Sequence, residues 1–250
     1  MGNNESTGKL NWAQPQTKPV AILIELVLVF TPIYLGLVFS NKLDSQHIAL
    51  GKELVILGGP LVYLGLLISL IVLWLFSRRR GASWEALGLK KPTKWWIVIL
   101  KSLGVALAVL GAVVLLVNPL LNTLPGLEPR DMSHFQILEG SLPNLLINLV
   151  LMWITAGFLE ELLWRGYLMN RLMDLFKSTS IITWVQVIIL SSIVFGLGHN
   201  YQGLYGVLKT GAVGLVFGLG YLAVGKSLWP LVIAHALIDS FDFITHYLGG

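Results

Sequence analysis

The sequence contains no cysteine and few charged residues. Of its 250 residues, 12% are charged and 55% are hydrophobic. The absence of cysteine excludes disulfides, thiolate nucleophiles and zinc–thiolate sites. Soluble domains carry about 25% charged residues, so this chain has too few polar side chains to cover a water-exposed surface. The low charge therefore predicts an integral membrane protein.

Positive charge is concentrated in loops that flank the hydrophobic segments. The net charge is +4, and residues 77–94 carry six lysines and arginines against Glu85 as the only acid. Basic loops beside hydrophobic segments are typical of the cytoplasmic side of membrane proteins. This pattern argues against a nucleic-acid partner. It predicts that the 77–94 loop and the N-terminus lie in the cytoplasm, at the plasma membrane of a prokaryotic cell.

The hydrophobic residues form blocks that can span a bilayer, which takes about 20 residues. These blocks cover about 20–40, 54–76, 95–120, 145–176, 181–198, 206–224 and 229–247. They predict an all-α fold, a polytopic membrane helix bundle with about seven transmembrane helices. We expect residues 1–18 to form a polar N-terminal tail and residues 19–250 to form a single integral membrane domain.

The fourth block contains three charged residues, Glu160, Glu161 and Arg165, in an otherwise apolar run. Ionised groups inside a membrane are costly and are functional by default. Glu161 and Arg165 are four residues apart, so they can pair on one helix face. Glu160 points roughly 100° away from Glu161 and has no local partner, so it can take up a proton as a general base does. The alternative is a structural ion pair that holds two helices together.

Two histidines lie in later blocks. His199 ends the fifth, and His235 lies in the seventh, four residues before Asp239. Glu160 and His199 are both roughly 25 Å from the turn between their helices, so they can face each other. We expect His235 to reach the same depth, in a site nearer the cytoplasmic face.

This set of side chains suits the hydrolysis of an amide by water. A carboxylate and an imidazole can hold and deprotonate a water. A second histidine with an acid can stabilise charge on a carbonyl oxygen. Glutamate and histidine are also zinc ligands, so Glu160, His199 and His235 could hold a metal ion, although no H-E-x-x-H motif is present. The favoured mechanism requires no cofactor, and zinc is the alternative.

Three motifs on successive membrane helices resemble those of a known family. They are Glu160-Glu161-x-x-x-Arg165, Phe195-x-x-x-His199 and His235-x-x-x-Asp239. In this order they are similar to the motifs of the CAAX protease and bacteriocin-processing (CPBP) family of intramembrane proteases. The resemblance covers about 145–247, which we expect to be the protease-like core.

The resemblance implies a role for each residue of the site. Glu160 and His199 hold the catalytic water, while Glu161 and Arg165 support the site. His235 and the residue four positions after it form the oxyanion site. That residue is often Asn in the family, whereas here it is Asp239. Because an ionised Asp repels an oxyanion, Asp239 must be protonated, or act as a metal ligand or a histidine partner.

The leading hypothesis is an intramembrane endopeptidase of the glutamate type, or a metalloendopeptidase. Its expected partners are the lipid bilayer and a peptide or protein substrate, such as a prenylated or leader-type peptide. One alternative is a non-catalytic factor for bacteriocin self-immunity or membrane assembly. Another is a proton-coupled transporter that uses Glu25 and the same charged groups as a relay. The motifs specify neither the substrate nor the oligomeric state.

Overall fold

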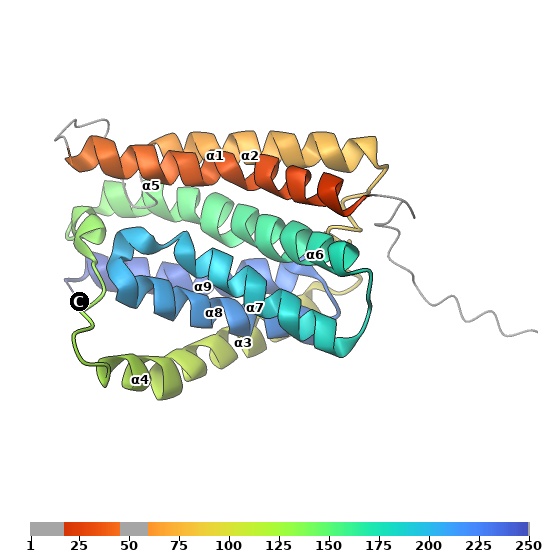
Figure 1. The fold of residues 1–250 in the computed structure, drawn as a ribbon. Helices are drawn as coiled ribbons and strands as arrows, with labels where there is room; N and C mark the ends of the chain where they lie inside the picture. Colours follow the sequence, from red (N-terminus) through yellow and green to blue (C-terminus); the bar gives the residue numbers. More distant parts are fainter. Residues whose placement is uncertain (1–17, 46–59, 250) are drawn as a thin grey trace, which may run out of the picture.

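The computed structural model describes residues 18–45 and 60–249, and their regular secondary structure is entirely helical (Figure 1). The α-helices are α1 (Pro19–Ser45), α2 (Pro60–Arg79), α3 (Trp95–Ala112), α4 (Asn118–Asn122), α5 (Leu142–Met152), α6 (Met169–Phe176), α7 (Ile181–Leu197), α8 (Gly203–Ala223) and α9 (Leu228–Tyr247). Three π-helical segments join some of them, namely η2 (Val113–Val117), η4 (Trp153–Glu160) and η5 (Leu162–Leu168). Two short 3-10 helices are η3 (Ser133–Leu138) and η6 (Asn200–Gln202).

The predicted polytopic helix bundle is confirmed. Within the described residues, six helical runs are long and apolar enough to cross a membrane, and α7 is a shorter apolar helix. The outward side chains of these runs are apolar as well, with Leu107 69% and Leu115 73% exposed. Such a surface suits contact with lipid. The start of the second predicted span, at 54–59, and the N-terminal tail lie outside the described residues. The single-domain organisation stays a prediction.

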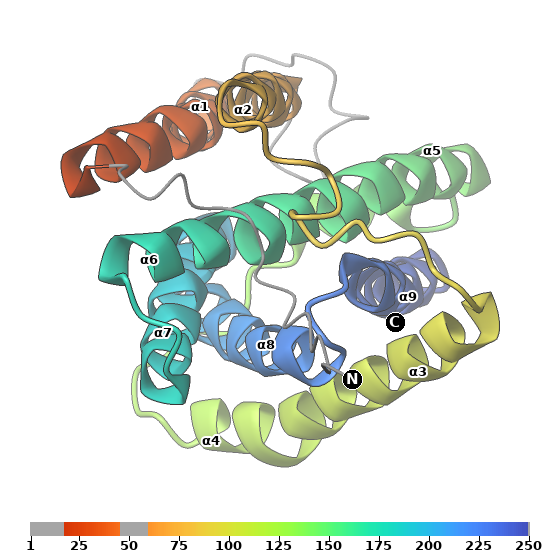
Figure 2. The same ribbon diagram turned by 90° about the vertical axis from the view of Figure 1, so that its right-hand side faces the viewer.

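The helices form a hairpin and a main bundle. In Figures 1 and 2, α1 and α2 lie side by side at one edge of the molecule. In the main bundle, α9 packs against α3, α5 and η4, and α7 packs against α8. The segment that joins α2 to α3 marks one end of the bundle, which we call the basic end. The 123–141 segment and the end of α9 lie at the opposite end.

Glycines set the closest approach between α7 and α8. A Cβ atom at Gly196 would lie 2.6 Å from the Val207 carbonyl oxygen and 3.1 Å from the Cα of Gly211. Side chains cannot be accommodated at such distances, so the two backbones touch only because glycine stands there. This contact fixes the last turn of α7, from which His199 extends.

A buried ionic cluster joins the α1–α2 hairpin to the main bundle. The Glu25 carboxylate, which is 4% exposed, accepts hydrogen bonds from the Tyr167 hydroxyl and from the guanidinium groups of Arg80 and Arg171. Arg80 follows α2, while Arg171 lies in α6. Glu25 of α1 is therefore a hydrogen-bond acceptor for side chains from three other parts of the chain: η5, α6 and the residue after α2.

The cluster predicts that Glu25→Ala destabilises the protein. Breaking a buried ion pair leaves an uncompensated charge, so we expect the free energy of unfolding to fall by about 3 kcal/mol or more. Unfolding of the purified protein in detergent measures this change. The matched control is Glu85→Ala, which removes an exposed acid at the same end of the bundle. Equal stability of the two variants would show that the cluster has no structural role.

Candidate active site

The fourth membrane helix changes its winding where the predicted site begins. α5 passes into η4 and then, after Glu161, into η5, before α6 resumes regular α-helical geometry. π-helical turns are rare and occur frequently at functional sites. Glu160 ends η4, so the two adjacent glutamates lie at the junction between the two π-helical segments.

A cavity of about 140 Å³ lies beside this junction. Glu160 from η4, His199 after α7, and His235 and Asp239 from α9 all line it. The structure thus brings together four predicted site residues that come from three parts of the chain.

Glu160 has an unsatisfied carboxylate oxygen. Its Oε2 atom is buried and has no hydrogen-bond partner among the described residues. Burying a polar atom without a partner is costly, and such atoms in native structures call for an explanation such as a catalytic role. The prediction that Glu160 is left without a local partner is consistent with this geometry.

His199 has one ring nitrogen engaged. Its Nδ1 lies 3.0 Å from the Phe195 carbonyl oxygen, to which it donates a hydrogen bond in the neutral ring. The Nε2 atom then carries the free lone pair and can accept a hydrogen bond from a water. The Phe195 ring packs against the imidazole edge to face, with 5.0 Å between centroids, which limits rotation of the imidazole.

Glu161 has two partners instead of the one predicted. Its Oε1 atom accepts a hydrogen bond from Arg165 Nη1 at 2.9 Å, as the spacing predicted, and another from His235 Nδ1 at 2.8 Å. Glu161 is fully buried, so it does not face the cavity. It orients the His235 ring instead.

Arg165 lies among aromatic rings. Its guanidinium carbon is 4.7 Å from the ring centroid of Phe195 and 5.1 Å from that of Phe217. The side chain is 2% exposed, and these cation–π contacts together with Glu161 compensate its burial. Arg165 thus supports the site from behind.

Asp239 lies beside the second nitrogen of His235. Its Oδ2 atom is 3.5 Å from His235 Nε2. Of the three roles left open by the sequence, this geometry favours that of a histidine partner.

The comparison with protein families agrees with this geometry. Residues 142–241 match the family model described as type II CAAX prenyl endopeptidase Rce1-like. This part of the chain is similar to the Rce1-like family. The match confirms the resemblance seen in the sequence, and it contains all the predicted site residues. Neither the comparison with curated proteins nor that with solved structures found a match.

The predicted zinc ligands of the Rce1-like segment do not fit a metal ion as they stand. Among the residues that the structure describes, no group of three or more histidine, aspartate or glutamate side chains is arranged so that it could hold one. Glu160, His199 and His235 nevertheless line one cavity.

Sequence reasoning missed the polar side chains that close the Rce1-like site. Arg130, which precedes that segment, lines the cavity and donates from Nε to Gln202 Oε1 at 2.8 Å. No signal in the sequence pointed to this contact, because the two residues are 72 positions apart. The 123–141 segment thus folds back over the helix ends.

The cavity is lined along α9 from His235 to Phe243, and Arg130 of the 123–141 segment lines it as well. The predicted depth of the site, nearer the cytoplasmic face, stays a prediction.

The geometry predicts strong coupling between Glu161 and Arg165. In a double-mutant cycle with Glu161→Gln and Arg165→Met, we expect a coupling energy of about 2 kcal/mol, because both groups are buried and share a hydrogen bond. Unfolding in detergent measures it. The control cycle uses Arg130 and Asp242, whose atoms are 4.0 Å apart and whose Asp242 side chain is 46% exposed. Such an exposed pair contributes less than about 1 kcal/mol. Equal couplings in the two cycles would contradict the prediction.

Proposed function

We propose that the protein is an intramembrane endopeptidase in which Glu160 and His199 activate a water for attack on a peptide carbonyl. The observation that carries this proposal is the meeting, in one cavity, of a buried carboxylate oxygen without a partner and a histidine with a free Nε2. A positioned base of this kind contributes roughly 10²–10⁴-fold to a rate. The match to the Rce1-like family supports the same reaction class.

Glu160 serves as the base and His199 orients the water. The water donates one hydrogen bond to the Glu160 carboxylate and the other to His199 Nε2. Attack forms a bond from the water oxygen to the carbonyl carbon, and the carbonyl π electrons move to its oxygen. Glu160 takes the proton that the water loses. It returns that proton to the amide nitrogen as the carbon–nitrogen bond breaks.

His235 stabilises the charge that develops on the carbonyl oxygen. Since its Nδ1 donates to Glu161, Nε2 is the atom that can donate to this oxygen when the ring carries both protons. Asp239 Oδ2 lies 3.5 Å from Nε2, an ion-pair distance, before the substrate binds. Glu161, Arg165 and Asp239 are therefore positioning residues, whereas Glu160, His199 and His235 contact the reacting atoms.

A narrow apolar cavity supports a membrane-associated substrate. Glu160 and His199 also line this second cavity, which is about 30 Å³ in volume. Its other walls include Leu37 of α1, Leu66 of α2 and Trp164 of η5. These apolar walls lie between the α1–α2 hairpin and the site, and the hairpin would have to move apart from the main bundle to admit a membrane-associated substrate, because the cavity is about the size of one water molecule.

We place the basic end in the cytoplasm of a prokaryotic cell. Arg78 and Arg79 lie in the last turn of α2, and Lys177 follows α6 at the same end of the bundle (Figure 1). The positive-inside rule supports a cytoplasmic N-terminus on the same side as these basic residues, and the plasma membrane of the cell is the membrane we propose.

Replacing the base tests the reaction. We expect Glu160→Gln, His199→Ala and His235→Ala to lower cleavage by about 10²-fold or more. The measurement compares the membrane proteomes of cells that carry wild type or Glu160→Gln, and looks for uncut precursors. The precursors identified in this way are then added to each purified protein in liposomes, and the rate of their cleavage is measured. Glu139→Gln, an exposed acid in the 123–141 segment, is the control.

The proposal would be lost if wild type and Glu160→Gln cleaved all candidate precursors equally. Because Glu160 forms no ion pair among the described residues, we expect Glu160→Gln to unfold at the wild-type temperature. This second readout separates a loss of chemistry from a loss of folding.

We also propose that the reaction needs no metal. We expect purified protein to keep full activity after treatment with a chelator, because the carboxylate and imidazole can activate water by themselves. Metal analysis of the same sample gives the bound content. Activity that is lost on chelation and restored by zinc would show the metalloendopeptidase mechanism instead.

A further inference from the structure

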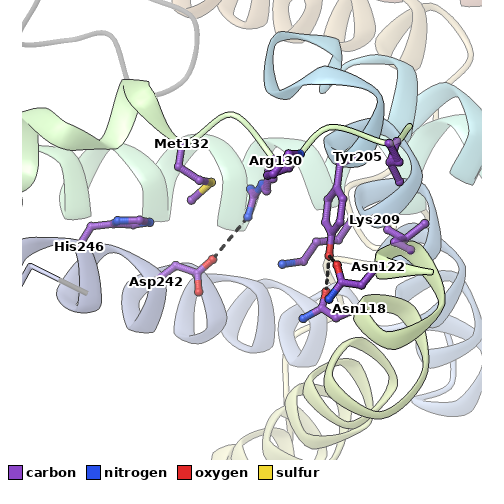
Figure 3. Close-up of a pocket in the computed structure, with 11 residues that line it drawn as sticks. Asn118, Asn122, Arg130, Met132, Tyr205, Lys209, Asp242 and His246 are labelled. Carbon is purple, nitrogen blue, oxygen red and sulfur yellow. Dashed lines mark hydrogen bonds and ion pairs between the residues drawn. The ribbon is translucent and has the colours of Figure 1, made fainter. Parts of the chain in front are cut away.

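A larger pocket adjoins the cavity (Figure 3). Its volume is about 560 Å³, and its walls come from α4, the 127–132 segment, α8 and the last turns of α9. It shares Arg130, Lys209 and Asp242 with the cavity of the candidate site. We call it the outer pocket. The shared side chains make the two spaces neighbours.

Lys209 is the cation of the outer pocket that forms neither a hydrogen bond nor a direct ion pair with the described residues, although the Asp242 carboxylate in the same pocket interacts with it electrostatically. Arg130 donates from Nε to Gln202 Oε1 at 2.8 Å, and its Nη1 lies 4.0 Å from Asp242 Oδ2. In contrast, the Lys209 ammonium forms no hydrogen bond or ion pair with any of the described residues. Figure 3 shows that it points into the pocket. Arg130 is thus already engaged by Gln202 and Asp242, whereas the Lys209 ammonium can still donate hydrogen bonds to a ligand.

The neighbours of Lys209 add further donors. The Tyr205 hydroxyl donates to Asn122 Oδ1 at 3.2 Å and lies 3.4 Å from Asn118 Oδ1. These contacts use the amide oxygens and leave the amide NH₂ groups of both asparagines for a ligand. An ammonium flanked by amide donors, in a half-enclosed pocket, is suited to an anion with several acceptor atoms.

We propose that the outer pocket binds a carboxylate of the substrate peptide through Lys209, while the bond to be cut lies at Glu160. This inference rests on the proposed function, since it assigns the pocket to the same substrate. The carboxylate can be the C-terminus of the peptide or an acidic side chain, because both present the same group. Arg130 is a positioning residue that holds the 127–132 wall of the pocket against η6 and α9.

A binding measurement tests the proposal without any cleavage. The full-length Glu160→Gln protein is placed in nanodiscs of phosphatidylcholine, so that no anionic lipid competes for the pocket. The probes are three peptides with an uncharged N-terminal dye. One is Ala-Leu-Leu-Ala with a free C-terminal acid, the second is its C-terminal amide, and the third is the amide with Glu in the last place. Fluorescence anisotropy gives the affinities.

We expect the free acid to bind about tenfold more tightly than the amide, because its carboxylate can accept a charge-assisted hydrogen bond from Lys209. Adding Lys209→Met should remove this preference, and Lys209→Arg should restore it. If the Glu-bearing amide also binds tightly, an acidic side chain serves as the anion; if it binds like the plain amide, the C-terminus does. Lys101→Met, which removes a cation from α3, is the matched control and should keep the preference.

Two results would overturn the inference. One is equal binding of acid and amide to the Glu160→Gln protein, including no detectable binding of either. The other is a preference that survives Lys209→Met. Because no step of this test involves cleavage, its failure is distinct from a failure of the protease proposal, which shows itself in the comparison of wild type with Glu160→Gln.

Discussion

The candidate site depends on one buried carboxylate, that of Glu161. Its Oε1 atom accepts hydrogen bonds from both Arg165 and His235, and so joins the fourth membrane helix to α9. A charge without exposure to solvent is tolerated only when it is paired and hydrogen-bonded. The imidazole of His235, the guanidinium between two phenylalanine rings and the π-helical junction are all arranged around this group.

Glu25 and Glu160, two other acids within apolar helices, differ in their partners and in their place. Glu25 accepts from three side chains and lies outside the cavity, so a relay from Glu25 to the site has no support in the geometry. Glu160 lines the cavity, and its Oε2 atom has no hydrogen-bond partner among the described residues. Glu161 Oε2 also lacks such a partner, but Glu161 does not line the cavity.

Much of the fold could be predicted from the sequence, because long hydrophobic runs indicate membrane-spanning helices. The ion pair Glu161–Arg165 could be predicted from the spacing of four residues within one helix. The six motif residues could be selected from the sequence because polar and charged groups stand out in apolar segments, and their roles stay predictions. The contact of Glu161 with His235 could not be predicted, because spacing does not tell which helices are neighbours. Similarly, hydrophobic periodicity does not reveal π-helical winding, and a polar loop such as 123–141 carries no sign of where it folds back.

Glu160 and His199 line two cavities, a small one beside the α1–α2 hairpin and a larger one that shares Arg130, Lys209 and Asp242 with the outer pocket. Hydrolysis inside a membrane, as proposed here, has a supply problem, because water does not dissolve in lipid. The charged side chains shared by the larger cavity and the outer pocket would give water a polar approach to Glu160, and would give the charged ends of the products the same path back to the aqueous phase.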